Sequence, residues 1–290
     1  MTYSEIWHRI ATSYDDGEAR AIARILIEEL FGLSYADIVC GATEQLSADD
    51  TLRLDTAVRR IEQGEPLQHV LGYADFCGNR FSVNSSVLIP RPETEWLVDE
   101  GAKLMSTTAA SSPKRILDIG TGSGCIAISL KLRLGDAYVE AWDISEEALR
   151  TAESNAQALK AEVTFRKRDA LRAENTAAHW DLIVSNPPYI CDSERSAMDD
   201  NVLLHEPHTA LFVPDDDPLR FYRAIARYAL LTLNTGGSLL FECNTRYAEA
   251  TGTMLRDMGF EEVTVSDDCF NLPRFVRGSS PSQPSPSGRA

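Results

Sequence analysis

The order of apolar segments after Lys114 constrains the fold of this chain more than any other feature. Five short segments rich in β-branched and aromatic residues alternate with helical segments, and they read RILDI, YVEAWD, EVTFR, DLIVSN and SLLFE. Strands separated by helices need crossover connections, which set the strands parallel in one sheet. Near the C-terminus, EEVTV and PRFVRG indicate an antiparallel hairpin at the sheet edge. The fold class predicted is α/β.

Residues 1–73 have a different pattern, in which apolar residues recur at helical spacing. The two repeating sets are Ile22, Ile25, Leu26 and Leu30, followed by Leu52, Leu54, Val58 and Ile61. Gly32 and Gly64 are the expected helix stops. We therefore predict a small helical N-terminal domain over residues 1–73.

The segments that flank the α/β pattern lack helical spacing. Residues 74–90 alternate apolar and polar side chains around Gly78-Asn79 and Asn84-Ser85, which predicts a β-hairpin linker. The main domain should then span residues 91–278. Residues 279–290 are rich in Ser and Pro and cannot bury a core, so we expect a disordered tail.

The charge of the chain disfavours two classes of partner. Its 44 acidic and 28 basic residues give a net charge of −16, which repels a phosphate backbone, so no stable nucleic-acid binding is expected. No apolar run approaches the roughly 20 residues of a membrane span, and the N-terminus resembles no signal peptide. We expect no membrane association and a cytoplasmic location. The six cysteines stand singly and the five histidines form no metal box, so no metal is expected.

A glycine-rich turn follows the first strand of the α/β pattern. Its residues Gly120, Thr121, Gly122, Ser123 and Gly124 lead directly into the helical segment CIAISLKLRL. Glycines let the backbone turn sharply and approach a ligand, and a helix N-terminus offers free N–H groups. A merely tight turn or a dinucleotide site could share this feature. The G-x-G-x-G spacing differs from the G-x-G-x-x-G of dinucleotide loops and better suits the zwitterionic tail of S-adenosylmethionine.

Carboxylates follow the next two strands. Asp143 ends the second strand, where it can accept hydrogen bonds from both ribose hydroxyls, although a dehydrogenase could show the same residue there. Asp169 follows the third strand and could accept from an adenine amino group, with Ala170 beside the ring. The alternative for Asp169 is a helix N-cap.

The most informative motif is Asn186-Pro187-Pro188-Tyr189, directly after the apolar strand LIVS. Two prolines fix φ and donate nothing, so the carbonyl groups of this turn form a rigid array of acceptors. Asn186 adds a side-chain acceptor, and Tyr189 adds a ring on which a planar amide or base could stack. This arrangement suits methyl transfer to an sp² nitrogen, because accepting both amide hydrogens orients that nitrogen. The alternative is a stiff turn without function.

These motifs together resemble the protein-(glutamine-N5) methyltransferases of the HemK or PrmC type, which modify the Gly-Gly-Gln loop of class-one release factors. The resemblance runs from about residue 18 to 278. It includes GEPLQHVLG (64–72), FCGNRFSV (76–83), VLIPRPETE (87–95), DIGTGSG, SNPPYI and EPHTAL (206–211). One departure is Glu242-Cys243-Asn244-Thr245-Arg246-Tyr247, where the family often has E-x-G-x-x-Q.

The resemblance implies a seven-stranded Rossmann-like methyltransferase domain and an N-terminal domain that helps to hold the release factor. Gly120 to Gly124, Asp143, Asp169, Ala170 and Asn186 would bind S-adenosyl-L-methionine. Asn186, Pro187, Pro188, Tyr189, Arg91 and Glu93 would bind the substrate glutamine, with Asn186, Pro187 and Tyr189 at the reacting amide. A monomer is the family expectation.

Three other functions remain as alternatives. A related branch methylates a glutamine of a ribosomal protein and shares N-P-P-Y, but GEPLQHVLG favours the release factor. Adenine-N6 methyltransferases of nucleic acid also share N-P-P-Y, but they need a basic recognition region that this acidic chain lacks. A non-enzymatic binding module would require a spoiled cofactor loop or acceptor motif, and both read as intact.

Overall fold

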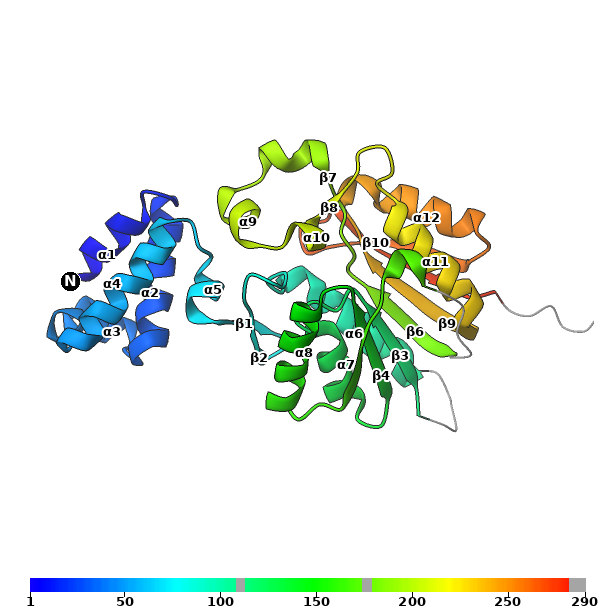
Figure 1. Ribbon diagram of the computed structural model, residues 1–290, viewed down its shortest axis with the longest axis horizontal. Coiled ribbons are helices and arrows are strands. Elements are labelled where there is room, and N and C mark those ends of the chain that lie inside the picture. The colour runs from blue at the N-terminus through cyan, green and yellow to red at the C-terminus, as the bar shows by residue number, and fades with distance from the viewer. Residues whose placement is uncertain (108–112, 174–178, 282–290) are drawn as a thin grey trace, which may run out of the picture. The chain divides into compact units, whose positions relative to one another are not determined.

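The computed structural model describes residues 1–107, 113–173 and 179–281 and separates into two compact units (Figure 1). The first unit comprises Met1–Tyr73, Val83–Ser85 and Met198–Glu206. The second unit comprises Ala74–Ser82, Ser86–Ala197 and Pro207–Ala290. The first unit thus includes a segment that lies far along the chain from the N-terminal helices.

The first unit is helical. Its helices are α1 (Tyr3–Ile10), α2 (Asp16–Phe31), α3 (Tyr35–Val39), η1 (Ala42–Gln45), α4 (Ala48–Glu62), α5 (Leu67–Leu71) and α9 (Asp200–His205). Helix α2 begins after Asp15, whose carboxylate accepts hydrogen bonds from the N–H groups of Gly17 and Glu18. It ends at Gly32, which has a left-handed φ of 68°. The expected helix stop at Gly32 is therefore present.

The core of the first unit contains most of the apolar residues that the helical spacing selected. Leu26, Leu54, Val58 and Ile61 are fully buried there. Leu52 is wrong in that set, because its exposed fraction is 65%. Leu54, Val58 and Ile61 follow the i, i+4, i+7 stripe of α4, whereas a residue two positions before Leu54 points to the opposite side of the helix.

The segment between the helices and the main sheet forms a β-hairpin of β1 (Tyr73–Phe76) and β2 (Asn79–Ser82). Cys77 and Gly78 connect the strands with φ values of 48° and 73°. Two successive positive φ values are typical of the tight hairpin turn whose twist matches the strands. Phe76 and Phe81 are buried in the core of the second unit, so the hairpin packs as part of that core.

A seven-stranded sheet forms the centre of the second unit, as predicted. Its order is β10-β11-β9-β6-β3-β4-β5. The strands are β3 (Arg115–Ile119), β4 (Tyr138–Asp143), β5 (Val163–Lys167), β6 (Trp180–Ser185), β9 (Leu233–Glu242), β10 (Glu261–Asp267) and β11 (Pro273–Ser279). The first five of these are parallel, and β11 pairs antiparallel with both β9 and β10. The chain turns back between β3 and β6, so the sheet has a topological switch point there.

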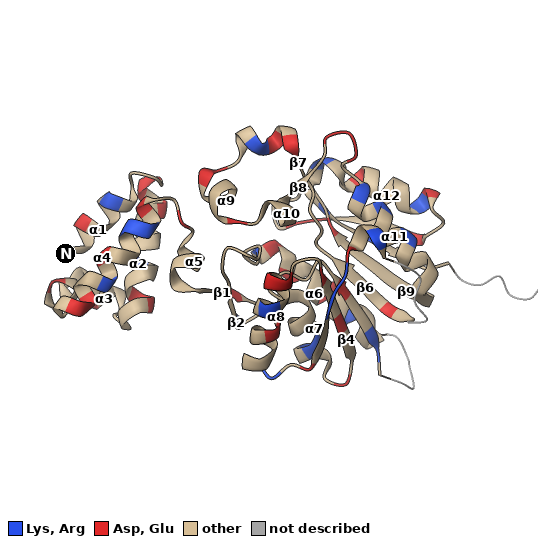
Figure 2. Cartoon of the chain, viewed as in Figure 1, with Lys and Arg blue, Asp and Glu red and all other residues tan. Residues whose placement is uncertain are grey.

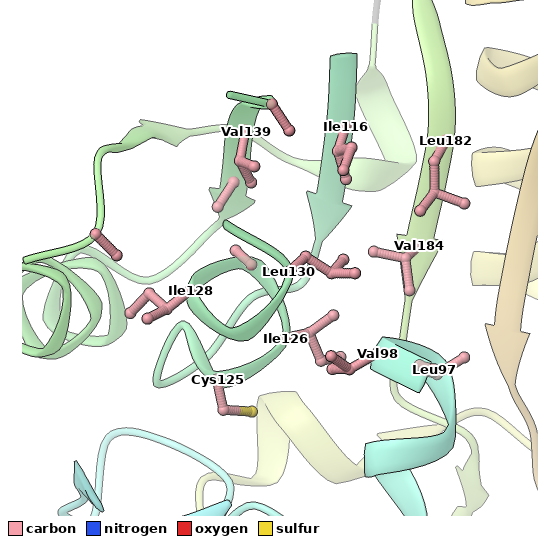
Figure 3. Close-up of a cluster of buried hydrophobic side chains, with 14 of the residues drawn as sticks. Leu97, Val98, Ile116, Cys125, Ile126, Ile128, Leu130, Val139, Leu182 and Val184 are labelled. Carbon is pink, nitrogen blue, oxygen red and sulfur yellow. The ribbon is translucent and has the colours of Figure 1, made fainter. Parts of the chain in front are cut away.

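Helices cover both faces of this sheet. The longer ones are α6 (Glu95–Thr107), α7 (Cys125–Leu134), α8 (Glu146–Ala158), α11 (Arg220–Thr232) and α12 (Ala248–Asp257). Ile116, Leu182 and Val184 face the core formed with α6 and α7, in which Ile126 and Leu130 lie beside Val184 (Figure 3). The alternate residues Leu117 and Ile183 face α11 and α12 on the other side. Burial on both faces explains why these strands are almost continuously apolar.

Short elements complete the second unit at the carboxyl edge and in the loops. They are η2 (Pro92–Thr94), η3 (Ala170–Arg172), β7 (Ile190–Cys191), η4 (Asp192–Ala197), α10 (His208–Leu211), β8 (Phe212–Val213) and η5 (Thr245–Tyr247). None of the described helices is long and apolar enough to cross a membrane. Lys and Arg positions are scattered among Asp and Glu positions along the described elements (Figure 2).

The C-terminal end of the sheet extends beyond residue 278, the last residue that we assigned to the main domain; we expected the tail to begin at residue 279. Ser279 is the last residue of β11. Ser280 is buried, its backbone N–H donates to Gly237 O at 2.8 Å, and its hydroxyl donates to Asn234 O at 2.6 Å. Pairing with the sheet orders these two serines despite their composition. Residues 282–290 lie outside the described part of the chain.

Candidate active site

A cavity of about 350 Å³ opens in the second unit at the carboxyl ends of β3, β4, β5 and β6. The loops that follow these four strands line it, together with residues 86–94 and 207–225. The switch point between β3 and β6 lies at this edge, and open α/β sheets bind ligands there. The cavity therefore lies where the sheet topology predicts a ligand.

The glycine-rich loop after β3 forms one wall of the cavity. The N–H groups of Gly120 and Thr121 both donate to Trp142 O, at 2.8 and 2.9 Å, which fixes the loop against the end of β4. Gly120 and Gly122 have φ values of 78° and 54°, a region that disfavours side chains with a Cβ. Nothing lies within 4 Å of a Cβ built on Gly122, so the backbone there is open to a ligand.

Gly124 has a different role from the rest of the loop. It does not line the cavity but precedes Cys125, the first residue of α7. A Cβ at Gly124 would lie 2.9 Å from Ile128 Cδ1 and 3.0 Å from Ala152 Cβ. Gly124 thus allows α7 and α8 to pack closely beneath the loop.

Asp143 lies at the end of β4 and lines the cavity, as its position in the sequence suggested. Its Oδ2 accepts the N–H of Gly122 and its Oδ1 accepts the N–H of Ser145, each at 2.9 Å. Each oxygen keeps a second lone pair that a ribose hydroxyl could use. Burial raises the pKa of Asp143, while the backbone N–H groups of Ser145, Gly122 and Ile144 oppose this shift.

Asp169 and Ala170 also line the cavity, after β5. Asp169 is the N-cap of η3, because its Oδ1 accepts the N–H of Leu171 at 2.9 Å. The capping alternative for this residue is therefore present in the structure. Its Oδ2 lies 3.7 Å from Arg172 Nε and, in the wall of the cavity, is a candidate acceptor for a ligand.

The N-P-P-Y turn after β6 forms the wall opposite the glycine-rich loop. Asn186, Pro187 and Pro188 line the cavity. The carbonyl oxygen of Asn186 is 4.0 Å from a Cβ built on Gly120, so the two loops approach each other closely. The Asn186 Nδ2 donates to Thr94 Oγ1 at 3.3 Å. The acceptor motif and the cofactor loop therefore share one cavity.

Tyr189 lies differently from our expectation of an open stacking surface. It does not line the cavity, and its hydroxyl donates to Glu242 Oε1 at 3.2 Å. Its N–H donates to Leu211 O at 3.2 Å. Burial and the neighbouring Glu242 carboxylate raise the pKa of Tyr189, so the hydroxyl keeps its proton at neutral pH. Tyr189 thus acts as a hydrogen-bond donor that connects the end of the motif to Glu242.

We expected both Arg91 and Glu93 beside the substrate, but the two residues lie differently around η2. Arg91 and Thr94 line the cavity, whereas Glu93 does not. Thr94 is 3% exposed and its hydroxyl donates to Glu242 Oε2 at 2.6 Å. The family resemblance placed Thr94 with Arg91 and Glu93 in the signature beside the site, and Glu242 in the segment that departs from the family pattern.

Several further cavity residues were missed. The pattern of α11 predicts core packing, yet Phe221 and Ile225 line the cavity, as do Ile144, Arg168, and Phe212. Arg168 also lies over the ring of Trp142, with 4.6 Å between its Cζ and the ring centroid. An apolar side chain on a helix looks the same in sequence whether it contacts a neighbouring helix or a ligand, so no signal distinguished these residues.

Across the described residues, no group of three possible metal ligands lies together.

Comparison with family models divides the chain in the same order as the sequence motifs. The model of the methyltransferase small domain matches residues 95–211, and the model of the PrmC N-terminal domain matches residues 8–72. The first match includes the glycine-rich loop and the N-P-P-Y turn. The second covers most of the N-terminal helices.

Curated relatives match the chain over nearly its full length. The release factor glutamine methyltransferase of Bacteroides thetaiotaomicron is 44% identical, and the match covers 91% of this chain and 93% of the relative. That of Flavobacterium psychrophilum is 38% identical, with 92% and 94% covered. Among solved structures, the catalytic domain of hMettl16 has a TM-score of 0.55 at 17% identity, covering 82% of this chain and 84% of that chain. This last likeness concerns the fold alone.

Proposed function

Since the chain belongs to the family of the release factor glutamine methyltransferases, we propose that it methylates a glutamine side-chain amide nitrogen in peptide chain release factors. The methyl donor is S-adenosyl-L-methionine and the acceptor is the glutamine of the Gly-Gly-Gln motif. The observation that carries the proposal is the single cavity shared by the glycine-rich loop and the N-P-P-Y turn.

The cavity fits the donor on its own chemistry. The open backbone at Gly122 can approach the amino-acid part of the ligand, and the lone pairs of Asp143 suit two ribose hydroxyls. Ile144 and Ala170 offer apolar surface to a ring, with Asp169 as an acceptor beside it. When bound, S-adenosyl-L-methionine supplies a methyl group on a positively charged sulfur.

Residues of the N-P-P-Y turn bind and orient the acceptor amide. An amide nitrogen is a weak nucleophile because its lone pair is delocalised into the carbonyl group. The oxygen of the Asn186 side chain and the carbonyl groups beside Pro187 accept the two hydrogens of the glutamine amide, which fixes the direction of its nitrogen. The same acceptors stabilise the positive charge that develops on that nitrogen. As the bond from sulfur to the methyl group breaks, the new nitrogen–carbon bond forms, and the methylated nitrogen then loses one of its hydrogens as a proton to water. Orientation and charge stabilisation, rather than a strong general base, carry the reaction in this proposal.

The remaining parts of the proposal concern the partner and the domains. Residues 1–73 help to hold the release factor, residues 91–278 carry the reaction, and the protein acts as a monomer in the cytoplasm. Methylation of a ribosomal protein or of adenine in nucleic acid remain the alternative reactions. The net charge of −16 disfavours the second.

Radiolabelled methyl transfer tests the proposal. We expect label from S-adenosyl-L-methionine on purified release factor and none on a variant whose Gly-Gly-Gln motif is changed to Gly-Gly-Ala. Ribosomal proteins and duplex DNA serve as parallel acceptors. Label that persists on the Gly-Gly-Ala variant, or that appears on a ribosomal protein or DNA instead, would contradict the proposed substrate.

A further inference from the structure

A series of hydrogen bonds connects Asn186 and Tyr189 of the N-P-P-Y turn to Thr94 and Glu242, two residues that have no role in the proposed function so far. The Thr94 hydroxyl donates to Glu242 Oε2 at 2.6 Å, and Asn186 Nδ2 donates to Thr94 Oγ1 at 3.3 Å. The Tyr189 hydroxyl donates to Glu242 Oε1 at 3.2 Å. Thr94 is 3% exposed and Glu242 is 1% exposed. Water therefore has little access to Thr94 and Glu242, the two residues at the centre of this hydrogen-bond series.

The chemistry of these groups decides which of them donates and which accepts in each hydrogen bond. An ionised carboxylate only accepts hydrogen bonds, so Glu242 commits the single hydroxyl proton of Thr94 to itself. Thr94 then offers only lone pairs to Asn186. A lone pair attracts the N–H of a side-chain amide and repels its oxygen. Asn186 must therefore turn its nitrogen to Thr94 and its oxygen away from Thr94.

The ionised form of Glu242, which this direction requires, is favoured by three neighbouring groups. Burial raises the pKa of Glu242, and Glu93 acts in the same sense, whereas the Thr94 and Tyr189 donors and the charge of Arg274 oppose the shift. These three partners oppose the effect of burial on the carboxylate, which stands at the end of a paired strand. Glu242 pairs with Phe275 across β9 and β11, and the N–H of Cys243 donates to Arg274 O at 2.7 Å.

We infer that Thr94 and Glu242 are positioning residues that hold the Asn186 side chain with its oxygen toward the reacting amide. The inference rests on the proposed function, because it assigns a direction to the acceptor that this function uses. Neither residue is among the groups that contact the substrate in the proposed function. A reversed Asn186 would present two N–H groups to the two N–H groups of a glutamine amide, and productive binding would be lost.

Thr94→Val tests the inference, because valine has nearly the volume of threonine and no hydroxyl. We expect kcat on release factor to fall by roughly 10- to 100-fold, the size typical of a misplaced reacting group. The KM for release factor and the dissociation constant of S-adenosyl-L-methionine should stay near their wild-type values, since the ribose and amino-acid contacts remain. Thr94→Ser keeps the hydroxyl and should restore most of kcat.

Two controls separate positioning from loss of structure. Thr232 is buried and its hydroxyl donates to Tyr228 O at 2.8 Å within α11, so Thr232→Val removes a comparable bond outside the cavity. It should leave kcat unchanged. The second control is a double-mutant cycle with single-turnover transfer of labelled methyl. If Thr94 acts through Asn186, Thr94→Val has no further effect in the Asn186→Ala background.

Each result bears on a definite claim. Wild-type kcat in Thr94→Val, or an effect of Thr94→Val that persists undiminished without Asn186, would overturn the positioning role while the wild-type protein still methylates release factor. A wild-type protein that transfers no label to release factor would overturn the proposed function and this inference with it. The two failures are therefore distinguished by the wild-type arm.

Discussion

At the scale of single residues, folding changes the protonation of Asp118 near neutral pH. It is completely buried beneath the glycine-rich loop, and Thr121 Oγ1 donates to its Oδ2 at 2.6 Å. Burial raises its pKa from an ordinary value of 3.8 to about 7, with the nearby charge of Asp143 acting in the same direction. The loop is thus supported by a carboxyl group that is near its midpoint of titration at neutral pH.

This shift predicts a pH-dependent stability. Between about pH 4 and 7 the folded protein keeps a proton on Asp118 that the unfolded chain has released, so the free energy of unfolding falls as the pH rises. Asp118→Asn has no such titration. We expect the variant to gain stability relative to wild type from pH 4.5 to 8, by up to a few kcal/mol. Urea unfolding of both proteins measures the difference, and a difference independent of pH would contradict the shift.

Single residues of the site differ in how well the sequence predicted their surroundings. Asp143 lines the cavity, and its position at the end of a strand could be predicted from the strand pattern alone. Tyr189 was less predictable. Its hydroxyl donates to the carboxylate of Glu242, which lies 53 positions further along the chain. No local sequence pattern predicts such a distant partner.

At the scale of elements, Asn155 of α8 joins three parts of the second unit. Its Nδ2 donates to Ser82 O at 3.0 Å in the β2 strand and to Ser123 O at 2.9 Å in the glycine-rich loop. The N–H of Ser82 donates back to its Oδ1 at 2.8 Å. Asn155 is 2% exposed. One buried side chain therefore links a helix, the hairpin and the cofactor loop.

Asn155→Ala should destabilise the second unit and weaken the cofactor site together. Ser123 O would lose a buried partner, and the N–H and O of the exposed Ser82 would lose theirs, so we expect the free energy of unfolding to fall by roughly 1–3 kcal/mol. The affinity for S-adenosyl-L-methionine should also fall, because Ser123 lines the cavity. Urea unfolding and calorimetry measure the two effects, with the exposed Glu153→Ala on the same helix as control. Equal stability of the two variants would contradict the linking role.

Element identities were largely predictable, whereas their contacts were not. The strands at 115–119, 138–143 and 180–185 lie where β-branched and apolar runs predicted them, because burial on both faces of a sheet selects such runs. The side of α11 that lines the cavity carries the same residue types as its packed side. Only the packing of that helix against the sheet decides which residues reach the ligand.

For the whole molecule, the main feature is the separation into two units with different cores. The core of the first unit contains residues of the N-terminal helices, and the two clusters of the second unit pack against its sheet. The cavity residues all belong to the second unit. Ligand binding should therefore stabilise the second unit directly.

We expect urea to unfold the protein in two transitions. S-adenosylhomocysteine at about 100 times its dissociation constant should raise the stability of the second unit by about 2.7 kcal/mol and leave the first unchanged. Trp7 belongs to the first unit and Trp96, Trp142 and Trp180 to the second. Fluorescence of a Trp7→Phe variant thus follows the second unit, while far-ultraviolet circular dichroism follows both. Coincident transitions that shift together would contradict the separation.

The sequence by itself determined the features that depend on neighbouring residues. The alternation of strands and helices, the glycine-rich loop and the N-P-P-Y turn each arise within a few positions, where backbone sterics and side-chain periodicity act directly. These features were enough for the α/β class and for the family resemblance, and the seven-stranded sheet confirmed the fold.

The tertiary structure alone decided which distant groups meet. Thr94 and Glu242 are 148 positions apart, and Asn186 is 92 positions from Thr94, yet one chain of hydrogen bonds joins them. Burial likewise set the pKa of Asp118, and folding brought residues 198–206 into the first unit. The physical reason is the same in each case. Desolvation and hydrogen-bond direction depend on which surfaces a fold brings together, and that information is distributed over the whole chain.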